Sequence, residues 1–169
     1  MRPDISLRNA GPQTRLATYL NDHLGGSATG RELARRTLQS NRGNEYGVVL
    51  EDVVRQIEED VESLLEVMRR LGVEPGRIKE ALGWAAEKVG RLKLNGQLLG
   101  YSPLSRLVEL EALMLGITGK LAMWQALRTV LGDDPRLEGI DLEQLAERAR
   151  DQGQTVEGLR RRAAAEALT

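Results

Sequence analysis

LEDVVRQIEEDVESLLEVMRRL, at residues 50–71, is the most regular stretch of the sequence. Its apolar residues recur at alternating steps of four and three, a spacing that places them along one side of a helix. They are Leu50, Val54, Ile57, Val61, Leu64, Met68 and Leu71. Gly72 comes next, at the position that favours a left-handed helix end. The stretch therefore predicts a long helix that packs against other helices through one apolar face.

The segments on either side of this stretch also predict helices. One is expected from about Gln13 to Ser40, and the polar turn at residues 41–47 ends it. The next begins at Pro75, since proline suits the first helical position. It repeats the apolar spacing through Ile78, Leu82, Ala85, Val89, Leu92, Gly96 and Leu99.

Two more helices are predicted in the C-terminal half. The first follows Ser102, which suits an N-cap, and residues 132–135 close it. Its apolar residues are Leu107, Leu110, Met114, Ile117, Leu121 and Trp124. The second runs over about residues 141–166 and opens with Asp141 and Gln144, a variant of the capping box.

These patterns together predict the fold class, which is all-α. No segment shows the alternation of apolar and polar residues that is typical of a strand. The short turns after the helices at 50–71 and 75–99 indicate antiparallel neighbours. We expect an antiparallel four-helix bundle with an additional C-terminal helix packed on it. Residues 1–12 are expected to form an N-terminal arm, and residues 13–169 a single helical domain.

The composition sets limits on the function. A chain of 169 residues has the size of one domain. Its 24 basic and 25 acidic residues give a net charge of -1 and no reason to expect a nucleic-acid partner. It has no cysteine, which excludes disulfides and thiolate metal sites. It has neither a secretory signal pattern nor an apolar run of about 18 residues. We therefore expect a cytoplasmic protein that does not enter the membrane.

Two stretches resemble the ferritin-like superfamily. YLNDHL at residues 19–24 is similar to the L-N-x-x-L opening of small ferritin-like proteins, and VESLLEVMRRLG at 61–72 is similar to the end of their second helix. GRLK at 90–93, YSPLSR at 101–106 and GK at 119–120 are shared with uncharacterised bacterial proteins of this length. The resemblance implies a ferritin-like bundle, and it implies no particular activity.

The ligand pattern of a di-iron centre is missing. Metal-binding members of the superfamily hold two irons with carboxylates and Glu-x-x-His pairs. When the second-helix endings are aligned, Ile57 takes the place of that Glu and Asp60 that of the His, while the first-helix Glu falls near Ser27. No metal or cofactor is therefore expected. The apolar face of the second helix places its carboxylates on the flanks or in solvent: Glu51, Asp52, Glu58, Glu59, Asp60, Glu62 and Glu66.

His23 is the only histidine and the first candidate for a functional site. Together with Ser27 it lies on or beside the inward face of the first helix, near Gly26 and Gly30. These small and polar residues could leave a pocket. Alternatively, the glycines allow close helix packing, and His23 hydrogen-bonds to a neighbouring carboxylate or carbonyl. No catalytic residue is assigned, because the adjacent Asp22 points away from His23 on a helix and no nucleophile motif is present.

Four other residues are candidate ligand contacts. Trp84 and Trp124 could stack on a planar ligand, although the spacing favours core packing for Trp124 and a helix boundary or exposed interface for Trp84. Glu111 and Lys120 flank the apolar face of the fourth helix, nine residues apart, so they cannot touch along it. Each could pair with another helix or reach a ligand. The run Arg160-Arg161-Arg162 is too short to indicate nucleic-acid binding.

Three functions remain open. The leading hypothesis is a non-enzymatic, metal-free bundle that acts through protein contacts, as a homo-oligomer or with a protein partner. The second is a small-molecule binding module with a pocket at His23 and Ser27. The third is a divergent metal-binding protein that uses Glu58, Asp60 and Glu111 with His23.

Overall fold

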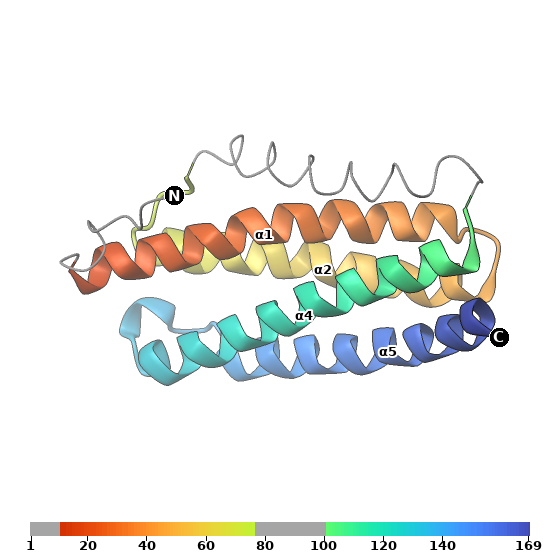
Figure 1. Cartoon of the computed structure of the whole chain (residues 1–169). Coiled ribbons are helices and arrows are strands. Elements are labelled where there is room, and N and C mark those ends of the chain that lie inside the picture. The colour runs from red at the N-terminus through yellow and green to blue at the C-terminus, as the bar shows by residue number, and fades with distance from the viewer. Residues whose placement is uncertain (1–10, 77–100) are drawn as a thin grey trace.

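The computed structural model of the protein describes residues 11–76 and 101–169. Every regular element in these two ranges is helical. The elements are α1 (Pro12–Ser40), α2 (Glu45–Arg70), α4 (Pro103–Leu131), a 3₁₀ helix (Pro135–Leu137) and α5 (Leu142–Leu168). In Figure 1 the four α-helices lie side by side, and the two helices of each pair, α1 with α2 and α4 with α5, run in opposite directions. The all-α class is therefore confirmed for the described residues.

Two parts of the predicted organisation lie outside the described residues. They are the helix expected from Pro75 to Leu99, of which the structure describes only residues 75 and 76, and the arm, of which it describes only residues 11 and 12. We expected the last helix to be an addition to a bundle of four earlier ones. In the described residues, α5 contributes buried side chains to the same core as α1, α2 and α4.

The helix ends follow the predicted local chemistry, with one exception. Oγ of Ser102 accepts a hydrogen bond from the Ser105 amide at 3.1 Å, and Oδ1 of Asp141 accepts one from the Gln144 amide at 2.9 Å. Gly72 has a φ of 67°, as expected for a left-handed helix end. The Ser102 cap and the Gly72 helix end are confirmed, and of the capping box the bond to the Asp141 side chain is observed.

The exception is the turn predicted at residues 41–47, which is shorter than expected. The Oδ1 atom of Asn44 accepts hydrogen bonds from the amides of Tyr46 and Gly47, at 2.9 and 3.1 Å. Asn44 is thus the N-cap of α2, and the helix begins at Glu45. We missed the cap because Tyr46 and Gly47 look like loop residues in the sequence. Both are buried in the first turn of α2.

The apolar core is divided into two clusters along the length of the bundle. All seven residues of the apolar face predicted for 50–71 are buried, which confirms that prediction. One cluster contains the second half of α2 with Leu20, Leu24, Trp124 and the start of α5. The other contains the first half of α2 with Leu33, Leu110 and the later part of α5. The level between the clusters is polar, and it is described with the site below.

Gly47 provides a test of the α2 start. A Cβ atom at this position would contact the backbone carbonyl oxygen of Asn41, which cannot move aside without opening the turn. We expect Gly47→Ala to lower the free energy of unfolding by about 1–3 kcal/mol, as overpacking does. Gly158→Ala is the matched control, because a Cβ there meets open space on α5. The control should be stabilised by about 0.5–1 kcal/mol through helix propensity. Urea denaturation measures both, and equal effects would contradict the interpretation.

Candidate functional site

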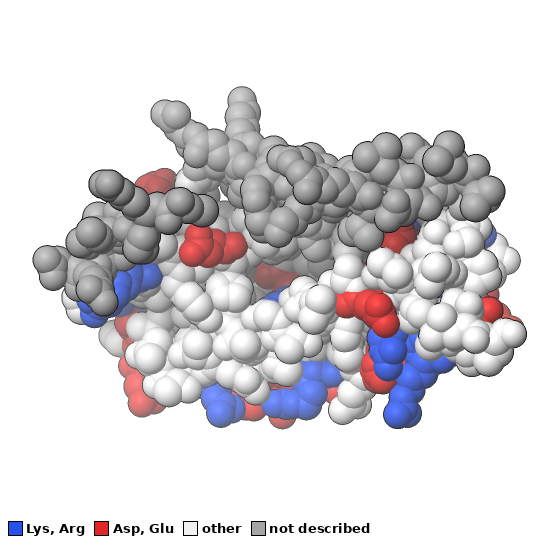
Figure 2. Space-filling model, viewed as in Figure 1, with Lys and Arg blue, Asp and Glu red and all other residues white. Residues whose placement is uncertain are grey.

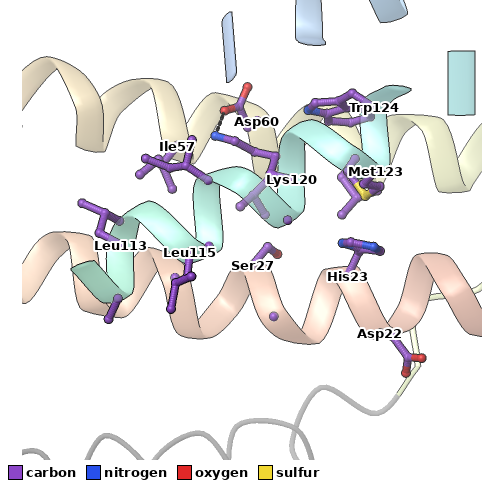
Figure 3. Close-up of a pocket in the computed structure, with 18 residues that line it drawn as sticks. Asp22, His23, Ser27, Ile57, Asp60, Leu113, Leu115, Lys120, Met123 and Trp124 are labelled. Atoms are coloured by element: carbon purple, nitrogen blue, oxygen red, sulfur yellow. Dashed lines mark hydrogen bonds and ion pairs between the residues drawn. The ribbon is translucent and has the colours of Figure 1, made fainter. Parts of the chain in front are cut away.

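A pocket of about 240 Å³ lies between α1, α2 and α4. One wall comes from residues 22–30 of α1, the second from 57–64 of α2 and the third from 112–124 of α4. Most of the lining is apolar, and it includes Ile57, Leu113 and Met123 (Figure 3). A small, mostly apolar cavity with a few polar groups is the usual form of a ligand site.

Glycines create much of this space. Gly26 and Gly30 line the pocket from α1, and Gly116 and Gly119 line it from α4. Among the described residues, a Cβ atom added at any of the four would meet no atom of another element within 4 Å. No described helix therefore packs closely against Gly26 or Gly30. Their missing side chains leave the cavity open.

Lys120 brings a cationic group to the pocket. Its side chain is 16% exposed, and its Nζ donates hydrogen bonds to Oδ2 of Asp60 and Oε1 of Gln152. Burial lowers the pKa of Lys120, and this effect outweighs the raising effect of the Asp60 carboxylate. An ammonium group has three N–H donors, so one of them has no partner in the described part of the chain and is available to a ligand.

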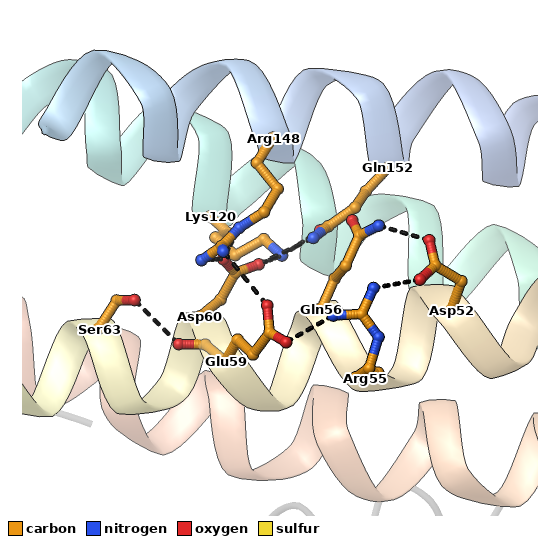
Figure 4. A network of polar contacts seen from close by, with 9 residues as sticks. All are labelled: Asp52, Arg55, Gln56, Glu59, Asp60, Ser63, Lys120, Arg148 and Gln152. Atoms are coloured by element: carbon orange, nitrogen blue, oxygen red, sulfur yellow. Dashed lines mark hydrogen bonds and ion pairs between the residues drawn. The ribbon is translucent and has the colours of Figure 1, made fainter.

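Asp60 is the centre of a polar network that joins three helices. Its side chain is 2% exposed, and besides Lys120 of α4 it has two partners on α5 (Figure 4). Nε of Arg148 donates to Oδ1 at 2.8 Å, and Nε2 of Gln152 donates to Oδ2 at 3.0 Å. Burying a carboxylate is costly unless it is paired and hydrogen-bonded in this way. The network lies between the two apolar clusters.

The position of Asp60 corrects two predictions. We expected this carboxylate on a flank or in solvent, and we expected the facing sides of the helices to be apolar throughout. The chain has a signal that we did not use. Val53 and Val67 lie seven residues before and after Asp60, and both are buried. The predicted face of α2 has two apolar positions in every seven residues, whereas the buried face has a third. Val53, Asp60 and Val67 occupy this third row.

His23, Ser27, Trp124 and Asp22 are the other polar residues that line the pocket. His23 and Ser27 point from α1 towards α4, whereas Asp22 points away (Figure 3). The His23 ring packs edge-on against Tyr19, with ring centres 4.6 Å apart. Burial lowers the pKa of His23, and Asp22 opposes this effect. Ser27 Oγ donates to the Leu24 carbonyl at 2.7 Å, so its lone pairs remain available.

Trp124 has an unsatisfied donor at the edge of the pocket. The side chain is fully buried, as the predicted core position required. Its Nε1 has no hydrogen-bond partner among the described residues. In Figure 3 the nitrogen end of the indole faces Lys120 and Asp60. A buried N–H without a partner is rare in native structures, so this donor is available to a ligand oxygen.

The structure brings together four of the six predicted ligand contacts. His23, Ser27, Lys120 and Trp124 all line the same pocket. Glu111 does not line it: this half-exposed carboxylate lies 3.7 Å from Arg160 of α5. Lys120 likewise reaches Asp60 on another helix, so the inter-helix pairing considered for both residues is observed. Trp84 lies outside the described residues. Gln152 was not predicted as a site residue.

Other kinds of site find little support in the described part of the chain. No group of three or more metal-ligating side chains gathers there, and no helix there is long and apolar enough to cross a membrane. On the face in Figure 2, acidic side chains lie among the basic ones. The guanidinium groups of Arg160, Arg161 and Arg162 each form an ion pair with a glutamate.

Comparison of the chain with protein-family models, with curated proteins and with solved structures found no match. The likeness to the ferritin-like superfamily therefore remains a prediction from the motifs. The site has to be interpreted from its own geometry.

Asp60→Asn tests whether the buried network holds the helices together. The substitution keeps the size of the side chain and leaves the Lys120 ammonium buried without its counter-charge. We expect the free energy of unfolding to fall by about 3 kcal/mol, as for other broken buried pairs. The double variant Asp60→Asn/Lys120→Met should recover part of this loss, because it removes both charges.

Glu62→Gln is the matched control for this experiment, since Glu62 is exposed on the same helix. Its effect should stay within about 0.5 kcal/mol. Urea denaturation of the four proteins measures these differences. A loss in Asp60→Asn no larger than in the control would show that the network does not stabilise the fold.

The titration of His23 can be followed without ambiguity, because the chain has one histidine. We expect an NMR titration of its imidazole to give a pKa below 6.5, since burial disfavours the charged ring. Between that pKa and 6.5 the unfolded chain binds more protons than the folded one. The free energy of unfolding of the wild type should therefore fall as the pH drops through this window. The free energy of unfolding of the His23→Gln variant should fall less over the same window. A pKa at or above 6.5 would contradict the burial of the ring.

Proposed function

We propose that the protein binds a small, largely apolar molecule in the pocket between α1, α2 and α4. The observation that carries this proposal is the pairing of an open cavity with unused donors at one edge. The Nε1 of Trp124 has no partner among the described residues, and Lys120 keeps one N–H beyond its two hydrogen bonds. An unmade hydrogen bond costs a buried donor about 1–3 kcal/mol, which a ligand oxygen would offset.

The volume of the pocket sets the size of the ligand. A cavity of about 150 Å³ in a protein core holds benzene, which has six carbon atoms. In proportion, the 240 Å³ pocket has room for about ten non-hydrogen atoms. Its walls would contact an apolar body, while the polar edge near Lys120 and Trp124 would hold one oxygen acceptor.

The ferritin-like relationship is part of the same proposal. The three positions that the resemblance assigns to metal ligands are Ser27, Ile57 and Asp60, and all three line the pocket. In this interpretation the pocket occupies the place of a metal centre whose ligands have been replaced. The ammonium of Lys120 supplies the positive charge beside the remaining carboxylate. The opposite directions within the helix pairs α1/α2 and α4/α5 agree with such a bundle.

The two other hypotheses gain no comparable support. Each carboxylate that a divergent metal site would use already has a cationic partner: Arg35 for Glu58, Lys120 and Arg148 for Asp60, and Arg160 for Glu111. Self-association and a cytoplasmic location remain predictions from the sequence. The pocket therefore gives the more specific proposal.

Ser27→Leu tests the pocket, because a leucine side chain at this position extends into the cavity. Octan-1-ol serves as the probe, since it has an apolar body, one oxygen and about the right size. At ten times its dissociation constant a ligand adds about 1.4 kcal/mol of stability. For a chain of this length that raises Tm by about 3–5 °C. We expect this rise in the wild type and not in Ser27→Leu.

Ser40→Leu is the control, since it makes the same change at an exposed position near the end of α1. It should respond to octan-1-ol like the wild type. Differential scanning fluorimetry gives the comparison. A wild type that octan-1-ol does not stabilise, or a Ser27→Leu variant that it still stabilises, would count against a ligand in this pocket.

A further inference from the structure

Lysine at position 120 is an unusual choice for this chain. The sequence has 20 arginines and 4 lysines, and Lys120 is the one lysine within the described residues. At the surface the chain pairs its carboxylates with arginine, as in Arg55 with Glu59 and Arg69 with Glu66. Arginine stays charged under all ordinary conditions, whereas a buried lysine can release its proton. The cation beside the pocket is thus the type that can become a neutral amine.

The surroundings of Lys120 favour this release. Its amine is largely withdrawn from water, and burial lowers its pKa. Asp60 does not depend on Lys120 alone, because Arg148 and Gln152 of α5 also hydrogen-bond its two oxygens. The carboxylate therefore keeps partners when the amine turns from Asp60 to another atom. A lysine that is desolvated in an apolar pocket is a usual nucleophile for attack on a carbonyl group.

We propose that Lys120 captures an apolar aldehyde of about ten non-hydrogen atoms as a Schiff base in the pocket between α1, α2 and α4. This inference rests on the proposed function and names the chemical class of the ligand. Trp124 lies one helical turn after Lys120 on α4, and its Nε1, which has no partner in the described ranges, is placed to donate to the aldehyde oxygen. The glycine-lined walls leave room for the apolar chain.

The reaction is balanced without any further reagent. The ammonium of Lys120 passes a proton to Oδ2 of Asp60, with which it is already hydrogen-bonded. The freed electron pair forms a bond from Nζ to the carbonyl carbon, and the electrons of the C=O double bond move to oxygen. Two protons reach that oxygen, one from nitrogen and one from Asp60, and it leaves as water. The product is a protonated imine with the same positive charge beside Asp60.

The charge balance of the site is an argument for this chemistry. Aldehyde and ammonium are converted to iminium and water, so the buried carboxylate faces one positive charge on nitrogen before and after the reaction. The ion pair between α2 and α4 is therefore preserved in the adduct. A carboxylate ligand would instead add a negative charge next to Asp60, and like charges at close range are unfavourable in a buried site.

Reductive trapping tests the proposal. The full-length protein is incubated with one equivalent of octanal and sodium cyanoborohydride, which reduces an imine to a stable secondary amine. Peptide mass mapping then locates the adduct, and Lys79, Lys88 and Lys93 act as internal references for unselective modification. We expect most of the adduct on Lys120. Excess octan-1-ol and the Ser27→Leu substitution should each reduce this labelling.

Lys120→Arg completes the experiment, because it keeps a cation beside Asp60 but cannot form an imine. It should lose the adduct at position 120. The mapping of the wild-type protein decides the matter even if this variant does not fold.

The outcomes separate the two proposals. If octan-1-ol stabilises the wild type but the adduct is spread evenly over the four lysines, the Schiff base is wrong and the pocket stands. If octanoate stabilises the protein more than octanal does, the ligand is a carboxylate and the Schiff base is again wrong. If no probe stabilises the protein and Lys120 is not labelled, both proposals fail.

Discussion

The buried carboxylate of Asp60 is the constraint on which the rest of the structure depends. A charge this far from water must keep its partners, and they come from α4 and α5. The two apolar clusters alone could tolerate a shift of one helix along another, since hydrophobic contact is not directional. Such a shift would separate Asp60 from Lys120 and Arg148. The polar level between the clusters thus selects one alignment of three helices.

The same level explains where the pocket lies. Asp60 and Lys120 meet where α2 and α4 face α5, and Gln152 closes that side. On the opposite side, α1 presents glycines and Ser27, which do not fill the space. The open space of the cavity therefore lies next to α1, and its charged groups lie on the side of α5. Its polar edge follows from the packing of the bundle as much as from any ligand.

Local signals in the sequence predict the helices well, because caps and apolar spacing act over a few residues. Ser102, Asp141 and Gly72 mark helix ends that the structure confirms. The local signals could not predict the buried charges of Asp60 and Lys120. A repeat with two apolar positions in seven residues describes the contact of one helix with one neighbour. In this bundle α2 and α4 touch neighbours on two sides, so a third row is buried. Asp60 is a polar residue in the third row of α2, and Lys120 is a polar residue in the third row of α4.

The candidate site was predicted in part for a similar reason. His23 and Ser27 follow from the inward face of a single helix, and Lys120 was placed beside such a face. That these residues share a cavity depends on how three helices are spaced, which no local pattern contains. The donor of Trp124 is a further case, since a tryptophan at a core position looks satisfied until its neighbours are known.

The partners of Asp60 on α5 also bear on how the chain is made. Arg148 and Gln152 belong to α5, which follows α1, α2 and α4 in the chain, so the ribosome makes these two partners after Asp60 and Lys120. Until α5 is made, the nascent helices would have to bury the Asp60 carboxylate with Lys120 as its partner. The pair α1 and α2 can form early, but the charge at its centre gains all its recorded partners only when α5 has joined it. The addition of α5 is therefore the step that completes the buried network.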